Sequence, residues 1–455
     1  MYKTIINAKI VTPGEIIEGS INIDGSGKIV EVGSDISSSE NVYDAKGQYV
    51  LPGLIEVHGH MREPGLTTKE DVPHGTKAAV AGGFTTIIDM PNTKPPTTTV
   101  ELLSEKINKI YPGRSYTDYA FFLGVGKDSL GELEKVDPET IAGIKVFMAG
   151  HETTPTTIPD DKTLSRIFEI CAEKNMLVAV HAEDQWLINY YTDKLKSEGR
   201  TDARAWTEGR PNEVIVTGAG RAIVLAEIFK TRLYLLHLST PEEFALVKAA
   251  SDRGNKIYGE LVSYQMVFNT DDYETLGNKI KVSPALRSKE NQEELWKLIK
   301  ERKIDVMCSE HTPHEWETKN QPDVWKAQSG TPGIQETLPG LITKWIEKYG
   351  KENIEEFLKL ISGYCSKNPA VIFGFSGKGE IKAGNDADLV VIDTENEWIV
   401  SKEDLFTKCG WSAYEGMKLS GRPEATFLRG ELVYEKGKIK GDPKGKWVRK
   451  EKANE

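Results

Sequence analysis

The chain has 455 residues, of which 38% are hydrophobic and 28% charged, a balance typical of a globular protein and not of a disordered one. Its formal net charge of −11 disfavours nucleic acid and anionic membranes as partners, because both require a basic surface. A small anionic substrate is compatible with this charge, since one buried arginine can bind a carboxylate inside an acidic protein. The composition leaves open whether the chain forms a homo-oligomer.

The sequence lacks the marks of a secreted or membrane-spanning protein. No uninterrupted apolar run is long enough to cross a bilayer, and Met1–Lys9 contains no apolar core of a signal peptide. The four cysteines are far apart and form no CxxC pair, which argues against a disulfide framework or a thiolate zinc site. We therefore expect a cytoplasmic protein.

The first fifty residues predict short strands at Thr4–Val11, Ser20–Ile23 and Lys28–Val32, separated by clusters of Gly, Asp and Ser. The middle of the chain then alternates strands with helices. The expected strands are Leu54–Val57, Phe84–Met90, Asp118–Leu123, Gly143–Met148, Leu177–His181, Leu233–His237, Lys256–Glu260 and Asp305–Cys308. Helical stretches include Thr163–Lys174, Ala219–Phe229, Pro241–Ala250 and Asn291–Arg302.

Eight strand-then-helix units over roughly 260 residues match an α/β fold of the (β/α)8, TIM-barrel type. Several strands are apolar at nearly every position, as expected for strands that are covered on both faces. A doubly wound open sheet is the structural alternative, but no GxGxxG fingerprint follows an early strand.

The end of the chain returns to short strands, at Asp388–Ile392, Ala425–Leu428 and Leu432–Tyr434. Two β-rich ends around an α/β middle predict one small β-sandwich domain assembled from both termini. We place its two parts at residues 1–52 and 375–455, and the barrel at residues 53–374.

Histidines gather where predicted strands end. Of the eight in the chain, five lie at or just after the carboxyl end of a strand: His58, His60, His181, His237 and His311. In a barrel these ends converge on one mouth, which holds the active site. Residues two apart on a strand point the same way, so both imidazoles of the His58-Gly59-His60 run can bind one cation.

Lys145 interrupts an apolar strand, where a buried ammonium without a partner is costly. One interpretation is a strand-end lysine that reaches water with its charged tip. The other is a functional lysine at the barrel mouth.

Six sequence blocks occur in the order that is typical of one enzyme group. They are His58–Gly65, Asp89–Thr93, Gly143–Met148, His181–Asp184, His237–Ser239 and Ser309–His314. Together they resemble the cyclic amidohydrolases of the amidohydrolase superfamily over nearly the whole chain. The resemblance implies a hydrolase that opens or closes a small cyclic amide.

The resemblance also implies a binuclear metal site. His58 and His60 would bind one divalent ion and His181 and His237 the other, with a carboxylated Lys145 and a hydroxide bridging both. Zinc suits imidazole and oxygen ligands, and manganese or cobalt could replace it. Glu310 stands where the family has a metal-binding aspartate that shuttles the proton, so it is the expected catalytic residue.

Within the superfamily, dihydroorotases resemble the chain best. Arg62, Asn92 and His314 fill the positions that hold the free carboxylate of the substrate in that branch, and Ser283 fills a further substrate-binding position. The expected reaction is therefore the reversible interconversion of N-carbamoyl-L-aspartate and L-dihydroorotate in pyrimidine biosynthesis. Hydantoinases usually carry Gln in place of Arg62, and allantoinases usually carry Asn.

Three departures from the dihydroorotase pattern keep other readings open. They are Glu310 for Asp, the run Val262–Gln265 in place of a TPHH-like run, and Ser283 in place of Asn. The alternatives are an allantoinase, a hydantoinase or dihydropyrimidinase, and a non-catalytic dihydroorotase-like scaffold protein. Of the other histidines, His74 is expected to be structural or exposed. His151 opens a Thr-rich loop, residues 152–159, that could cover the site.

Overall fold

The computed structural model describes residues 2–34, 41–150, 154 and 156–450, and its centre is an eight-stranded parallel sheet. The strands follow one another in chain order: β6 (Leu54–Gly59), β7 (Phe84–Asp89), β8 (Asp118–Gly124), β9 (Gly143–Phe147), β10 (Leu177–His181), β11 (Arg232–Leu238), β12 (Ile257–Val262) and β13 (Val306–Cys308). All eight predicted strands are confirmed. The unbroken order excludes a doubly wound sheet, in which the strand order reverses at a switch point.

Hydrogen bonds connect the first and last strands and so bring the sheet close to a closed barrel. The Ser309 amide donates to Oε2 of Glu56 on β6 at 2.9 Å, and the His60 amide donates to the His311 carbonyl at 3.0 Å. Every residue of β6 to β10 is buried, as expected for parallel strands with helices outside and packed side chains inside.

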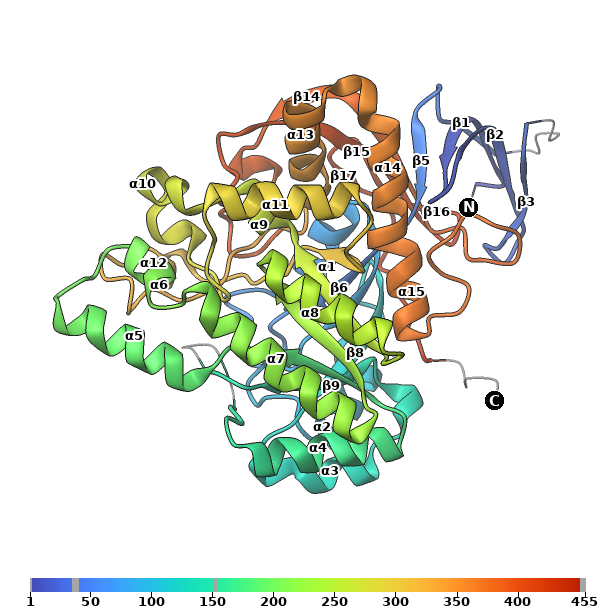
Figure 1. The fold of residues 1–455 in the computed structure, drawn as a ribbon. Helices are drawn as coiled ribbons and strands as arrows, with labels where there is room; N and C mark the ends of the chain where they lie inside the picture. Colours follow the sequence, from blue (N-terminus) through green and yellow to red (C-terminus); the bar gives the residue numbers. More distant parts are fainter. Residues whose placement is uncertain (1, 35–40, 151–153, 155, 451–455) are drawn as a thin grey trace.

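Helices surround the barrel (Figure 1). They are α1 (Val72–Ala81), α2 (Val100–Glu105), α3 (Leu130–Lys135), α4 (Asp161–Glu173), α5 (Gln185–Ser197), α6 (Arg204–Glu208), α7 (Asn212–Phe229), α8 (Pro241–Asp252), α9 (Ser263–Val267), α10 (Tyr273–Leu276), α11 (Lys289–Lys300), α12 (Trp316–Lys319), α13 (Thr337–Tyr349), α14 (Ile354–Ser362) and α15 (Asn368–Phe373). The four predicted helices correspond to α4, α7, α8 and α11. Among the described residues, no helix is both long and apolar enough to cross a membrane.

Local sequence explains where these helices begin. Thr240 caps α8 by accepting from the Glu243 amide, while the Glu243 carboxylate accepts from the Thr240 amide in return. Pro241 follows at the first helical position, where its missing N–H has no intrahelical partner to lose.

A second, nine-stranded sheet is built from both ends of the chain, and β1, β2 and β3 lie at one edge of the molecule (Figure 1). Its strands are β1 (Thr4–Val11), β2 (Ile16–Ile23), β3 (Ile29–Gly33), β4 (Val42–Asp44), β5 (Tyr49–Pro52), β14 (Leu389–Ile399), β15 (Lys418–Leu428), β16 (Glu431–Glu435) and β17 (Lys438–Ile439). β5 and β14 pair antiparallel and join the two ends. Ile21, Val50 and Phe427 belong to its separate apolar core. The small β unit is confirmed, and the boundaries at 52/53 and 374/375 stay predictions.

The segment between β14 and β15 leaves this sheet and returns to the mouth of the barrel. The Thr407 hydroxyl donates to Oε2 of Glu70 at 2.6 Å, and the Trp411 indole N–H donates to the His314 carbonyl at 2.7 Å. The carboxyl-terminal part of the chain therefore supports the wall of the barrel mouth, which the sequence did not predict.

Candidate metal centre and active site

A cavity lies at the carboxyl ends of the barrel strands. Its lining includes the predicted metal-binding residues His58, His60, Lys145, His181, His237 and Glu310. These six come from β6, β9, β10 and β11, and from the turns that follow β6 and β13. Each is at most 8% exposed, so the strand ends bring six ligand-type side chains together away from bulk water.

The distances between these side chains suit shared cations. The ligand atoms of His58, His237 and Glu310 all lie within 4.8 Å of one another, and Nε2 of His58 is 3.9 Å from Oε1 of Glu310. Nδ1 of His181 is 2.8 Å from Nε2 of His237. The ring centroids of His58 and His60 are 5.4 Å apart. The HxH run therefore places both imidazoles at the same cavity, as its spacing predicted.

The donor set fits divalent metal ions. Burial lowers the pKa of His58 to about 4, that of His60 well below its usual range, and that of His181 in the same direction. These imidazoles are neutral at physiological pH, which is the form that binds metal. Nδ1 of His60 is buried and has no hydrogen-bond partner in the part of the chain that the structure describes.

Two buried carboxylates orient the histidines. Oε1 of Glu260, on β12, lies 2.5 Å from Nδ1 of His58 and accepts from the His237 amide at 3.0 Å. Oε2 of Glu183 lies 2.7 Å from Nε2 of His181. Carboxylates in this position fix the ring orientation of a ligating histidine and raise its basicity. Neither role was predicted from the sequence, although a Glu at the end of an apolar strand was a signal for Glu260.

Lys145 lies on β9 with 1% of its surface exposed, which is inconsistent with a lysine tip in open water. Its Nζ is 4.4 Å from the centroid of the Phe147 ring, and no carboxylate of a described residue lies within 4.0 Å. Burial lowers its pKa to about 7, so a substantial fraction of the amine is uncharged and nucleophilic at neutral pH.

Glu310 lies two residues after the end of β13, the last barrel strand, and adopts a left-handed backbone, with φ of 48°. Burial raises the pKa of its carboxyl group well above the usual range. The hydroxyl of Tyr264, on α9, donates to its Oε2. In the sequence Tyr264 stood out only as a departure from the family pattern. Tyr264 and Glu310 both depart from the family pattern, and this shared unusual character was the signal that could have suggested a contact between them.

The predicted substrate-binding residues separate into two groups. Asn92 and Ser283 line the cavity, and Ser283 Oγ lies 2.9 Å from Ser329 Oγ. Arg62 and His314 are not among its lining residues. Arg62 is buried, donates from Nε to the Pro313 carbonyl at 3.2 Å, and has Nη2 3.1 Å from Nε2 of His314. These two side chains contact each other and the backbone, and their role in holding a substrate carboxylate stays a prediction.

The remaining histidines differ in their roles. His311 lies at a strand end as predicted, but its Nε2 is 3.2 Å from Oε2 of Glu70 and it does not line the cavity. His74, on α1, has Nδ1 2.7 Å from Oδ1 of Asp71 and a side chain that is 45% exposed, as predicted. His151 lies outside the described residues.

Comparison with known proteins agrees with this site. The model of the amidohydrolase family matches residues 49–433. An allantoinase from Rubrobacter xylanophilus is 33% identical over 448 residues, which cover 97% of each chain. An L-hydantoinase from Paenarthrobacter aurescens is 32% identical over 450 residues, which cover 96% of each chain. The solved L-hydantoinase (dihydropyrimidinase) from Arthrobacter aurescens superimposes with a TM-score of 0.93 at 29% identity, over 99% of this chain and 100% of that one.

These relatives carry the names of the alternatives considered above, and the predicted dihydroorotase branch receives no specific support from them. The family match spans most of the chain, and it agrees with the barrel and with the cluster of histidines at its mouth. The chain therefore belongs to the amidohydrolase family, whose members are hydrolases.

Proposed function

We propose that the protein is a metal-dependent cyclic amidohydrolase that opens the hydantoin ring, as in hydantoin itself or in allantoin, which is a ureido-substituted hydantoin. Support comes from the names of the relatives, allantoinase and L-hydantoinase, and from the lining of the cavity. Both names describe enzymes that act on the same five-membered ring.

Two divalent ions, with zinc as the first candidate, would be held by the clustered side chains. His58 and His60 would bind one ion, His181 and His237 the other, and Lys145 would bridge both as a carbamate. The neutral amine of Lys145 can add CO2 and release a proton, and the resulting anion would offset the repulsion between two cations. The ions would supply Lewis acidity at the scissile carbonyl and lower the pKa of a bound water.

The other lining residues would handle the ring and the protons. With two cations beside it Glu310 would be ionised, and it would accept the proton of the attacking water and pass it to the departing ring nitrogen. Asn92 and Ser283 offer hydrogen-bonding groups for the amide edges of a ring, and Phe147 offers an apolar wall. The buried position of the cavity would limit the access of other water molecules to the reacting atoms.

One observation favours an uncharged ring over dihydroorotate. Among the described residues that line the cavity, Lys145 is the only lysine or arginine, and its proposed carbamate would make it anionic. No lining lysine or arginine is then left to bind a substrate carboxylate. A neutral hydantoin or allantoin does not need one.

Dihydroorotase remains the second candidate because of Arg62. Its guanidinium is buried two residues after the HxH run, and no carboxylate of a described residue lies within 4.0 Å of it. A rotation of this side chain toward the cavity would supply the carboxylate anchor that dihydroorotate requires.

A substrate panel tests the proposal. The protein is loaded with Zn²⁺, Mn²⁺ or Co²⁺ in the presence of bicarbonate, and ring opening of hydantoin, allantoin, dihydrouracil and dihydroorotate is followed. We expect the highest kcat/KM with hydantoin or allantoin. Turnover of dihydroorotate alone would overturn the proposal in favour of the second candidate. A metal-loaded protein with no activity on any of the four would favour the scaffold interpretation.

Two variants, each assayed with the same four substrates, test the roles of Lys145 and Arg62. Lys145→Ala should abolish most ring opening, whereas Lys135→Ala, at an exposed lysine of α3 that pairs with Glu132, should leave it unchanged. Arg62→Lys keeps the charge but loses the planar fork. It should therefore weaken dihydroorotate turnover far more than hydantoin turnover.

A further inference from the structure

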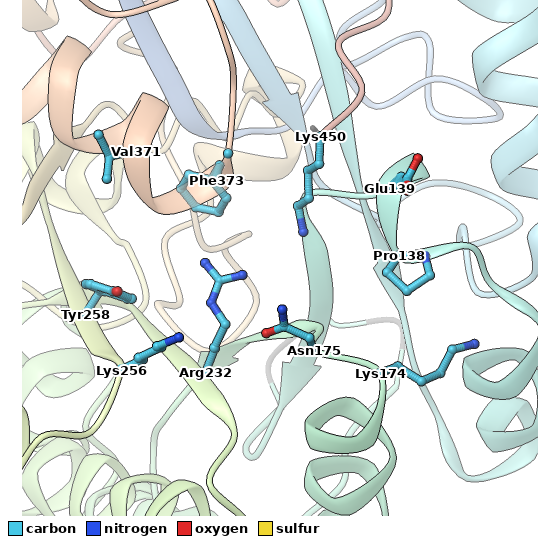
Figure 2. A pocket seen from close by; sticks show the side chains of 11 residues that line it. Pro138, Glu139, Lys174, Asn175, Arg232, Lys256, Tyr258, Val371, Phe373 and Lys450 are labelled. Atoms are coloured by element: carbon cyan, nitrogen blue, oxygen red, sulfur yellow. The ribbon is translucent and has the colours of Figure 1, made fainter. Parts of the chain in front are cut away.

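A second cavity lies at the opposite end of the barrel, at the amino ends of the central strands (Figure 2). Arg232 is the first residue of β11, Lys256 directly precedes β12, and Asn175 precedes β10 by one residue. Active sites of (β/α)8 barrels lie at the carboxyl ends of the strands. This cavity is therefore separate from the metal centre.

The lining of this cavity is basic, although the chain as a whole carries a net charge of −11. Arg232, Lys256 and Lys450 all line it, and none has a carboxylate within 4.0 Å in the part of the chain that the structure describes. Lys174 also lines it, but its ammonium donates to three backbone carbonyls at 2.8 to 3.0 Å. Glu139 is the one acidic lining residue, and its carboxylate lies 3.4 Å from Arg449. Among the described residues, these three cations around one space therefore have no carboxylate partner.

Two of these cations face each other. Figure 2 shows the side chains of Arg232 and Lys450 pointing toward one another, with the amide of Asn175 beside them. Nη2 of Arg232 donates to the Ile372 carbonyl at 2.7 Å, which fixes the guanidinium at the wall. Burial, together with the charge of Arg232, lowers the pKa of Lys450 to about 7. An anion between the two groups would remove this mutual repulsion.

We propose that this cavity binds the phosphate group of a small molecule. A guanidinium offers paired N–H donors that match a phosphate, and ammonium groups bind it as point charges. Asn175 can add an amide donor, and the rings of Tyr258 and Phe373 offer an apolar wall for the organic part of the ligand. The site takes no part in the ring-opening reaction and does not depend on the proposed substrate.

Binding of pyrophosphate to the full-length, metal-loaded protein tests this proposal. Isothermal titration calorimetry is run at constant ionic strength, with sodium chloride as the reference salt. We expect saturable binding by the unaltered chain. Arg232→Gln/Lys450→Gln should weaken it by roughly tenfold or more, because hydrogen bonds to charged groups contribute that much. The single variant Lys256→Gln, at an exposed lysine, should weaken it less.

A matched control removes one arginine and one lysine elsewhere. Lys248→Gln/Arg253→Gln acts at ion pairs on and just after α8, and should leave pyrophosphate affinity unchanged. Metal-dependent activity without pyrophosphate should be the same in Arg232→Gln/Lys450→Gln as in the unaltered protein. The proposal is overturned if binding does not exceed the chloride reference. It is also overturned if Arg232→Gln/Lys450→Gln binds normally, since pyrophosphate would then lie at the metal centre.

Discussion

Replacing Tyr264 with phenylalanine tests how this chain uses a glutamate at position 310. The Tyr264 hydroxyl donates to Oε2 of Glu310, and burial raises the pKa of the phenol well above its usual value, so it stays a donor at neutral pH. Glutamate is one methylene longer than the aspartate of the family, which shifts the carboxylate by roughly 1.5 Å. We expect Tyr264 to hold this longer side chain in its reactive orientation. Phenylalanine keeps the buried ring and removes only the donor.

The size of the effect follows from that one hydrogen bond. A hydrogen bond to a charged group contributes about 1.5–3 kcal/mol, and each 1.36 kcal/mol changes a rate about tenfold. The kcat of Tyr264→Phe should therefore fall by about ten- to a hundredfold. Tyr264 does not line the cavity, so KM should change by less than about threefold. Glu310→Asp should also lower kcat, by up to about a hundredfold, because it draws the carboxylate back from the reacting atoms.

A double-mutant cycle separates a positioning role from a general loss of stability. Steady-state kinetics are measured for the unaltered chain, Tyr264→Phe, Glu310→Asp and the double variant, each at the same metal content. The shorter aspartate does not reach the hydroxyl, so Tyr264→Phe should cost little once Glu310→Asp is present. Equal losses in both backgrounds, or no loss in the unaltered chain, would refute the idea that Tyr264 acts through Glu310.

Three further predictions concern the metal centre and the barrel mouth. Lys145→Ala should lower the metal content below two ions per chain by plasma emission spectrometry, and a metal-free protein with full activity would contradict the assigned site. Glu260→Gln should weaken metal affinity by about ten- to a hundredfold, because it removes the charge that orients His58. The affinity is measured by competition with a chelator, and an unchanged value would exclude this role of Glu260. Thr407→Val should lower the free energy of unfolding by about 1 kcal/mol, since it loses the hydrogen bond to Glu70. Urea denaturation measures this difference, and a difference near zero would show that the bond does not stabilise the barrel mouth.

The barrel was predicted from strand and helix periodicity, and the expected metal-binding side chains from strand-end positions together with the family resemblance. A strand places alternate residues on one face, so His58 and His60 must point the same way wherever the strand lies. Parallel strands in chain order bring their carboxyl ends to one mouth, which also places Lys145, His181 and His237 together. Strand alternation and strand order can be predicted without the conformations of the loops.

Contacts made by loops and turns could not be predicted in this way. Arg62 follows the HxH run by two residues, but its left-handed backbone, with φ of 59°, and the Pro313 carbonyl direct its side chain to His314. The hydrogen bond of Tyr264 to Glu310 joins residues 46 positions apart on different βα units. Sequence position and residue type do not determine such distances.

The sequence by itself therefore determined the (β/α)8 barrel, the small sheet from both chain ends and the strand-end histidines and lysine that meet at the barrel mouth. Only the tertiary structure decided which residues face the substrate cavity, which carboxylates orient the histidines, and how Thr407 and Trp411 reach the barrel mouth. The physical reason is the range of the interactions. Strand alternation and helix capping act within a few residues, whereas the cavity is shaped by loops that are far apart in the sequence.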